Sequence, residues 1–382
     1  MQLDIEQAEE LTHMKVIDLF AGCGGLSLGF IQAGYDVKQA VEFDSVIANT
    51  YQINHPQVNM IVDDIKNIDT SGTFEGENAD IIIGGPPCQG FSMAGARIRR
   101  GFIDDPRNYL FKHYFNVVKE VMPTVFIMEN VKGIATMKEG KIFREIQRLF
   151  QDSEALGGKQ YHVFHRIINA TDFGVPQRRE RMIILGTLIK DTDIEALWEK
   201  TKKDIMQDIP SYFDTVTIRE AIGNLPMTTP DGIIQNPIPE TEYEKYLSCD
   251  AKTIANHIQS RHSKVAVERM KQIKNGENYT VLNEQINSVH SGSYGRLCWD
   301  EQSPTITTRF DTPAGGRFIH PAENRTLTPR EAARIQSFPD SYTFYGDKRS
   351  ISRQIGNAVP PKVSYFLARL VLNILATDST GE

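Results

Sequence analysis

The sequence lacks several features that would place it in other classes of protein. Its four cysteines, Cys23, Cys88, Cys249 and Cys298, have no CxxC spacing, so we expect neither a disulfide framework nor a metal site. Residues 1–12 are acidic and contain no signal-peptide core. Apolar runs of roughly 18 residues, internal repeats and low-complexity tracts are missing as well. We therefore expect a cytoplasmic globular protein, and its 382 residues suffice for one large domain or two ordinary ones.

A net positive charge, which is typical of proteins that bind nucleic acids, is also missing. The formal net charge is −7 at pH 7, which argues against phosphate binding by the chain as a whole. Arginine nevertheless gathers in two places. Such clusters are either a solvated face or a local surface for anions. Their members are Arg97, Arg99, Arg100 and Arg107, and then Arg178, Arg179 and Arg181.

A strand followed by a cysteine stands out at 79–92. Residues 81–83 are a β-branched run, typical of a strand buried on both faces. The glycines and prolines of 84–87 end it. Cys88 therefore follows a strand at the edge where open α/β sheets bind ligands. Considered alone, such a cysteine is more often a small buried hydrophobic residue than a nucleophile.

The first segment of the chain has the pattern of a nucleotide-type cofactor site. A strand, a glycine-rich turn and a helix are expected at 15–20, 21–25 and 26–33. The glycines do not have P-loop spacing, and a tight turn without a ligand is the alternative. Glu42 ends a second strand, where it either binds ribose hydroxyls or is a surface carboxylate. Asp64 follows a third strand and either holds an adenine amino group or caps a helix.

A second carboxylate follows the strand expected at 125–128. If this strand neighbours the one at 81–83, Glu129 opens into the same crevice as Cys88. Considered alone, Glu129 is more often a capping or supporting carboxylate than a catalytic one.

The apolar patterns divide the chain into three segments. About seven strands are expected within 14–190, which indicates one wound α/β domain. Residues 92–108 have no periodic apolar pattern and are expected to be a long functional loop. The strongly apolar helix expected at 363–376 should return and bury on the first domain. The predicted segments are 1–190, a loop-rich small domain at 191–325, and a return segment at 326–382 with a helix at 328–337 and a loop at 355–361.

Five ordered blocks resemble the signature blocks of the DNA (cytosine-5) methyltransferases. They are DLFAGCGG (18–25), GPPCQGFS (85–92), ENV (129–131), QRRER (177–181) and GNAV (356–359). A further block, TPREAARIQSFP (328–339), resembles the same family, so the match runs from about residue 14 to the C-terminal helix. The resemblance implies a class I S-adenosylmethionine-dependent methyltransferase fold, α/β and Rossmann-like, with a target-recognition domain at 191–325.

The resemblance also implies S-adenosyl-L-methionine as the methyl donor. Carried over position by position, the residues that would line its pocket are Phe20, Gly22, Cys23, Gly24, Gly25, Glu42, Asp64, Ile65, Gly85, Leu110, Asn357 and Val359.

The implied chemistry assigns a role to each polar group. C5 of cytosine is a poor nucleophile, and addition of the Cys88 thiolate at C6 activates it. Glu129 would share a proton at N3, and Arg181 would hold O2. Arg179 would hold this site or a flanking phosphate. The base that removes the C5 proton is not named by the sequence.

A stacked base cannot offer both C5 and C6, so the target cytosine is expected to leave the helix. The loop 92–108 would then grip phosphates, which answers the objection from net charge. Arg296 or Arg309 would read guanine edges, and Phe310 would pack on a thymine methyl or a vacated base site, with phosphate contacts equally open. The predicted DNA-binding residues are Gln89, Ser92, Arg97, Arg99, Arg100, Arg296, Thr307, Arg309 and Phe310.

Three rival functions remain. One is an RNA cytosine-5 methyltransferase of the same fold, although GFS at 90–92 resembles the DNA-acting form. Another is a catalytically silent DNA-binding relative, although the nucleophile and the glycines are intact. The third is a nicotinamide-dependent oxidoreductase, and the glycine pattern argues against this hypothesis. We expect a compact prokaryotic or phage-type enzyme that is monomeric, nucleoid-associated in the cytoplasm, and accompanied at most by a separate restriction endonuclease.

Overall fold

The computed structural model describes residues 14–74, 79–87, 109–284, 286 and 291–378. They fall into two compact units, within 1–169, 180–212 and 363–382 for the first and within 170–179 and 213–362 for the second. These units place 191–212 with the first domain and 326–362 with the second. The three segments expected at 1–190, 191–325 and 326–382 stay a prediction.

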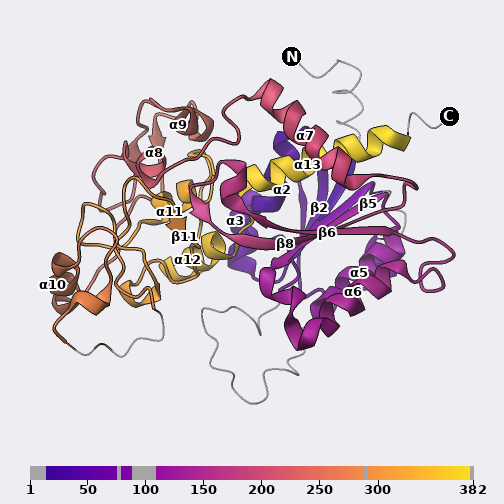
Figure 1. Ribbon diagram of the computed structural model, residues 1–382, viewed down its shortest axis with the longest axis horizontal. Coiled ribbons are helices and arrows are strands. Elements are labelled where there is room, and N and C mark those ends of the chain that lie inside the picture. The colour runs from indigo at the N-terminus through magenta and orange to yellow at the C-terminus, as the bar shows by residue number, and fades with distance from the viewer. Residues whose placement is uncertain (1–13, 75–78, 88–108, 285, 287–290, 379–382) are drawn as a thin grey trace. The chain divides into compact units, whose positions relative to one another are not determined.

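A seven-stranded sheet forms the centre of the first unit, in the order β3-β2-β1-β4-β5-β8-β6 (Figure 1). Strand β8 is antiparallel to both of its neighbours, and the pairings among the first five strands are parallel. The prediction of about seven strands, with β4 and β5 as neighbours, is confirmed. The strands are β1 (Lys15–Leu19), β2 (Asp36–Glu42), β3 (Asn59–Val62), β4 (Ile81–Gly84), β5 (Val125–Val131), β6 (His162–Asn169) and β8 (Glu180–Thr187).

Helices cover both faces of this sheet. In the view of Figure 1, α5 and α6 lie below the strands, and α7 and α13 lie above them. The face under α5 and α6 has an aromatic core, in which the rings of Phe126 and Phe150 stack with centroids 4.1 Å apart. The helices are α2 (Gly25–Gln32), α3 (Ser45–Asn54), α4 (Thr70–Phe74), α5 (Leu110–Val121), α6 (Lys141–Gln151), α7 (Ile194–Asp208) and α13 (Pro361–Asp378), with short 3-10 turns η5 (Lys132–Ala135) and η6 (Met137–Gly140).

Helix α13 packs closely on α2. A Cβ atom on Gly29 would lie 2.3 Å from the backbone nitrogen of Tyr365, so only glycine permits this approach. The Tyr35 hydroxyl donates a hydrogen bond to the carbonyl of Ala368. Burial of so apolar a helix stabilises the unit through the hydrophobic effect. In the part of the chain that is described, no helix combines the length and the apolarity needed to cross a bilayer.

The second unit consists mostly of loops and short helices. Among its described residues, three helices begin with a complete capping box, at Thr217, Thr241 and Thr328. The loop expected at 355–361 is partly wrong, because 355–357 are the last turn of a helix. The elements are η7 (Ala170–Phe173), β7 (Gln177–Arg178), α8 (Ile218–Ile222), β9 (Ile234–Gln235), α9 (Glu242–Leu247), β10 (Thr253–Ile254), α10 (Lys264–Gln272), η8 (Tyr279–Val281), β11 (Ser303–Pro304), η9 (Pro313–Gly315), α11 (Pro329–Ile335) and α12 (Lys348–Asn357).

Candidate active site

The turn that follows β4 is held against β5. The side-chain amide of Asn130 donates to the carbonyl of Pro86 at 2.9 Å. The Tyr114 hydroxyl lies within hydrogen-bond distance of the carbonyls of Ile82 and Ile127, so α5 ties the two strands together. A Cβ atom on Gly85 would lie 3.4 Å from Oε2 of Glu129. The backbone of the turn therefore runs directly beside this carboxylate.

Glu129 and Arg181 form an ion pair at this edge of the sheet. Nε of Arg181 lies 2.9 Å from Oε1 of Glu129, and the side chains are 16% and 11% exposed. They come from antiparallel neighbours, in which Arg181 is paired in register with Val131. Burial lowers the pKa of Arg181, and the Glu129 charge opposes this shift. The structure thus brings together two of the residues that the sequence predicted to be catalytic.

The glycine turn has an unusual backbone. Phe20, a bulky residue, has φ +59°, and Gly22 and Gly24 have φ +56° and +91°. A positive φ is rare for a bulky residue, and such strain often marks a functional site. The Cys23 thiol is buried, and burial raises its pKa to about 12, so this sulfur is a poor nucleophile.

Glu42 supports the turn from β2. Its Oε2 accepts a hydrogen bond from the backbone N–H of Gly22, and its Oε1 accepts one from that of Asp44, each at 3.0 Å. Burial raises the pKa of Glu42, and these two hydrogen bonds oppose the rise. The carboxylate is therefore buried at the turn and is not the surface carboxylate that the sequence left open.

Three further predicted cofactor residues belong to one hydrophobic cluster. Ile65 and Leu110 are buried in it, and Phe20 packs against it. Asp64 is half-buried and pairs with Lys66 at 3.1 Å. Phe43, which follows Glu42 and was not among the predicted site residues, is 66% exposed. An exposed aromatic residue directly after the acid at a strand end makes Phe43 a further candidate for this site.

Some predicted site residues belong to the second unit. Asn357 is exposed at the end of α12, and Val359 is buried. Arg179 is buried and donates to the carbonyls of Ile306 and Gly356. Its guanidinium is covered by protein, which argues against the expected contact with a flanking phosphate, and the alternative contact with the reacting base stays a prediction.

Two of the predicted sequence-reading residues are structural. Arg296 is 5% exposed, and its guanidinium donates to the carbonyls of Met270, Ile273, His320 and Glu323 and to the side chain of Asn324. Phe310 is fully buried. The predicted base contacts of Arg296 and Phe310 are therefore wrong, because both side chains are buried and neither can reach a base. Arg309 is exposed, and Thr307 is half-buried.

Six predicted residues lie outside the described part of the chain. They are Cys88, Gln89, Ser92, Arg97, Arg99 and Arg100.

The comparison with family models decides which enzymes the chain belongs with. The model of the C-5 cytosine-specific DNA methylases matches residues 14–373. The chain belongs to this family. The methylase accordingly acts on C5 of cytosine in DNA, and its family and fold imply S-adenosylmethionine as the cofactor.

Individual relatives agree with this assignment. The methylase is 35% identical to the type II methyltransferase M1.HphI of Haemophilus parahaemolyticus, across 94% of this chain and 87% of that protein. It is also 35% identical to M.DdeI of Desulfomicrobium norvegicum, across 94% and 88%. A crystal structure of a protein encoded within an Escherichia coli prophage superimposes with a TM-score of 0.74 and 30% identity, and covers 95% of this chain and 99% of that one.

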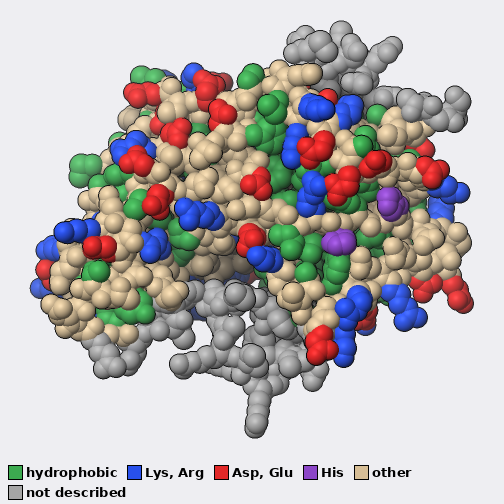
Figure 2. All heavy atoms as spheres, viewed as in Figure 1, with side chains coloured by type: hydrophobic (Ala, Val, Ile, Leu, Met, Phe, Trp, Pro, Cys, Tyr) green, Lys and Arg blue, Asp and Glu red, His purple; other side chains and the backbone are tan. Residues whose placement is uncertain are grey.

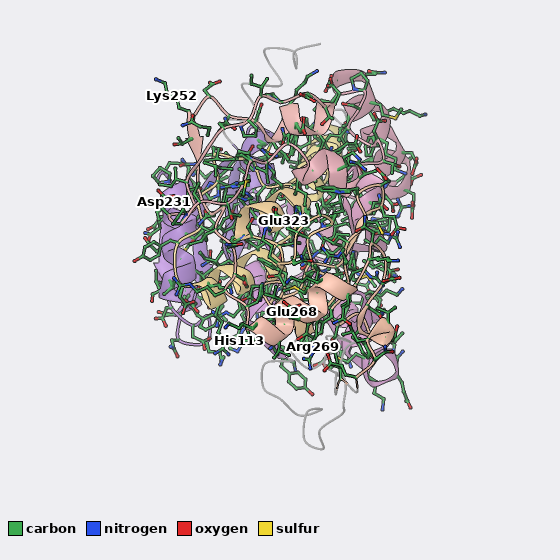
Figure 3. The ribbon with its side chains drawn as sticks, turned by 90° about the vertical axis from the view of Figure 1, so that its left-hand side faces the viewer. His113, Asp231, Lys252, Glu268, Arg269 and Glu323 are labelled. Atoms are coloured by element: carbon green, nitrogen blue, oxygen red, sulfur yellow. The ribbon has the colours of Figure 1, made fainter. Side chains whose placement is uncertain are left out.

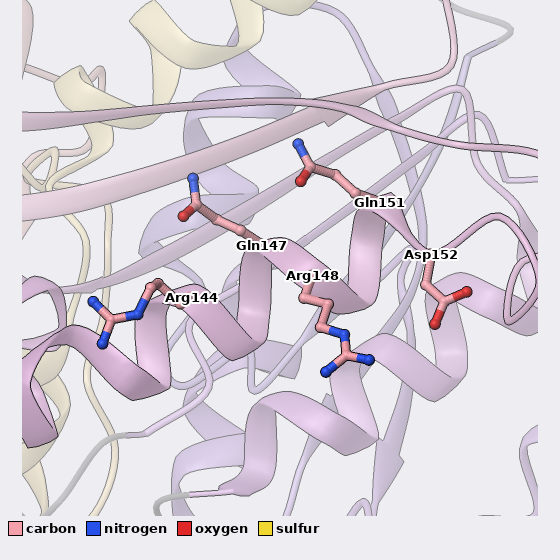
Figure 4. A pocket seen from close by; sticks show the side chains of 5 residues that line it. All are labelled: Arg144, Gln147, Arg148, Gln151 and Asp152. Atoms are coloured by element: carbon pink, nitrogen blue, oxygen red, sulfur yellow. The ribbon is translucent and has the colours of Figure 1, made fainter.

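Other surface features of the methylase are less distinctive. A pocket of about 350 Å³ on α6 is lined by Arg144, Gln147, Arg148, Gln151 and Asp152, none of which was predicted as a site residue (Figure 4). On the face shown in Figure 2, acidic and basic side chains are interspersed. In the second unit, Arg269 on α10 forms a bidentate ion pair with Glu284. Figure 3 labels Arg269 beside Glu268.

Proposed function

We propose that this methylase modifies a flipped-out cytosine within a specific duplex DNA sequence and uses Cys88 as its nucleophile. The Glu129–Arg181 pair carries the proposal. It lies beside the turn 84–87, and Cys88 is the next residue of the chain. A thiolate that follows this turn would share its surroundings with a carboxyl group and a guanidinium, which are the partners that a pyrimidine ring needs.

Each group would act on a different atom of the ring. The Cys88 thiolate forms a bond to C6, and the electron pair of the C5–C6 double bond becomes available at C5. Glu129 holds the proton at N3, while Arg181 donates to O2, where negative charge builds up. After C5 has gained its methyl group, a base removes the C5 proton. The returning electron pair restores the double bond and expels the thiolate.

The residues of the glycine turn fit the cofactor that the family implies. A Cβ atom placed on Gly22 meets nothing within 4 Å, so the space over the turn is open. The Glu42 carboxylate would bind the ribose hydroxyls, Asp64 the adenine amino group, and Phe43 a face of the adenine ring. When bound, S-adenosylmethionine supplies an electrophilic methyl group.

Recognition of DNA would fall to the second unit and to the loop 92–108. Arg309 is the exposed candidate for a guanine edge or a phosphate. The names of the type II relatives support a place in a restriction-modification system. We infer a monomer that works beside a separate endonuclease, at the nucleoid in the cytoplasm.

The test is transfer of labelled methyl groups to duplex DNA and to transfer RNA. We expect methylation of DNA only, and none with Cys88→Ala. The matched control is Cys298→Ala, which removes a thiol of the second unit and should retain activity. Methyl transfer by Cys88→Ala, or methylation of RNA in preference to DNA, would refute the proposal.

A second experiment identifies the nucleophile directly. Duplex DNA with 5-fluorocytosine at the target site cannot lose its C5 substituent as a proton. A denaturation-resistant adduct should therefore accumulate and map to Cys88. An adduct on Cys23 or Cys298 would show that the nucleophile is wrongly assigned.

A further inference from the structure

A buried hydrogen-bond chain lies under the glycine turn and takes no part in the chemistry above. The Ser27 hydroxyl donates to Oδ2 of Asp18 at 2.6 Å, and the Tyr51 hydroxyl lies 2.7 Å from the Ser27 oxygen. None of the three side chains is more than 1% exposed. The chain joins β1 and α2, which flank the turn, to α3.

The direction of this chain follows from its protons. A hydroxyl carries one proton, and that of Ser27 is given to Asp18. When Asp18 is ionised, Tyr51 donates to Ser27, and both hydroxyls point their dipoles toward the carboxylate. Oδ1 of Asp18 is buried and has no hydrogen-bond partner among the described residues. The carboxylate is thus only half satisfied, which is costly for a buried charge.

No described cation is among the groups that act on Asp18. The groups that act on it from the neighbouring elements are Ser27 on α2, Glu42 on β2, Tyr51 on α3, Tyr114 on α5, and Cys23 in the turn. None of these described side chains is a cation. Burial raises the pKa of Asp18 to about 7, contacts with Ser27 oppose the rise, and the Glu42 charge adds to it.

We propose that Asp18 is a positioning residue that couples the binding of a cationic cofactor in the glycine turn to the release of a proton. The inference rests on the proposed cofactor site. A cation in the turn would bring a positive charge near the Asp18 carboxylate and so favour its ionised form. The ionised form in turn polarises Ser27 and Tyr51, and this holds α2 and the turn in place.

The cofactor and its product differ in the charge on sulfur, so their binding can be compared. S-Adenosylmethionine carries a sulfonium charge, and its product S-adenosylhomocysteine carries a neutral thioether. Binding of the cofactor should therefore release more protons than binding of the product. Near neutral pH the affinity for the cofactor should rise with pH, because deprotonated Asp18 binds it better.

The experiment is isothermal titration calorimetry of the full-length protein at about pH 6, 7 and 8, in buffers with different heats of ionisation. We expect wild type to release up to about half a proton near pH 7 and to gain about three- to tenfold in cofactor affinity from pH 6 to 8. The product should show a smaller release. Asp18→Asn should show neither proton release nor pH dependence, and circular dichroism checks that it is folded.

Ser27→Ala keeps the test decisive if Asp18→Asn does not fold. Loss of the Ser27 donor should raise the pKa of Asp18 further, so proton release should move to higher pH. Equal proton release by wild type and both variants, or none by wild type, would overturn the inference. Failure of wild type to bind the cofactor at all would instead refute the proposed function.

Discussion

The Nε atom of Arg181 lies 2.9 Å from Oε1 of Glu129, across two antiparallel strands of the first unit. Each partner lies in a different block of the sequence, and the insertion of β8 next to β5 joins them. The pair is largely buried, so each charge depends on the other. It lies beside the turn that leads into Cys88, and this relationship ties the proposed chemistry to the fold.

Replacement of Glu129 tests the role of its carboxyl group. Glu129→Gln keeps the size of the side chain and removes the acid, so methyl transfer should fall about 10²- to 10⁴-fold. Binding of DNA and of cofactor, measured separately, should change little. Glu180→Gln is the matched control, because Glu180 is exposed and pairs with Lys132. Activity of Glu129→Gln within tenfold of wild type would contradict the assignment.

Two arginines of the second unit should behave in opposite ways. Arg296→Ala removes a buried guanidinium that holds five acceptors, so the free energy of unfolding should fall by about 3–5 kcal/mol. Arg309→Ala should leave stability unchanged and weaken DNA binding by about 1–3 kcal/mol. Urea unfolding and DNA titration measure the two effects. A stable Arg296→Ala with altered sequence preference would restore the original assignment.

A buried ion pair should make the second unit sensitive to acid. Burial by itself would raise the pKa of Glu331, but the hydrogen bonds and charge of Arg325 outweigh it and lower the pKa to about 2. A depressed pKa stabilises the folded state above the ordinary value of 4.5, and this stabilisation is lost as pH falls toward 2.

Glu331→Gln should therefore cost roughly 3 kcal/mol at pH 7, and the cost should shrink below about pH 4.5. Urea unfolding between about pH 7 and 3 measures it. Glu323→Gln is the control, because this partner of Arg325 is 44% exposed and should contribute less than about 1 kcal/mol. A cost that does not change with pH would rule out the linkage.

The contact between α2 and α13 should tolerate no side chain at position 29. Gly29→Ala places a Cβ atom 2.4 Å from Cβ of Ser364, and backbone atoms block its escape. We expect a loss of at least about 2 kcal/mol in thermal or urea unfolding. In Gly72→Ala the nearest atom is the flexible carboxylate of Asp69, so this control should remain near wild type. Equal stability of the two variants would mean that the helices separate easily.

Most strands of the first unit could be predicted because their signal is local. Runs such as 81–83 are apolar on both faces, and the structure buries all three residues completely. Helix α7 was not predicted, although Ile194, Trp198 and Ile205 follow a helical spacing that would have shown it. Helix α12 has few apolar residues, and tertiary contact selects it: a Cβ atom on Gly356 would meet the backbone of Thr307 at 2.5 Å.

The arginines show where sequence patterns reach their limit. Arg181, Arg296 and Arg309 have the same side chain, and each was assigned to the site from its block or its loop. The structure gives Arg181 a carboxylate partner, encloses Arg296 among carbonyl groups, and leaves Arg309 exposed. Burial depends on residues that are remote in the chain, so no local pattern distinguishes the three.

The order of the motifs, the strand-forming runs and the chemical character of the site were determined by the sequence alone, because side-chain type and backbone preference act over a few neighbouring residues. The tertiary structure alone decided which charges meet. Glu129 meets Arg181 only because β8 enters the sheet between β5 and β6, and Asp18 is sealed under the glycine turn only because α2 and α3 close over it. Such contacts join distant segments, and their strength comes from the exclusion of water by the whole fold.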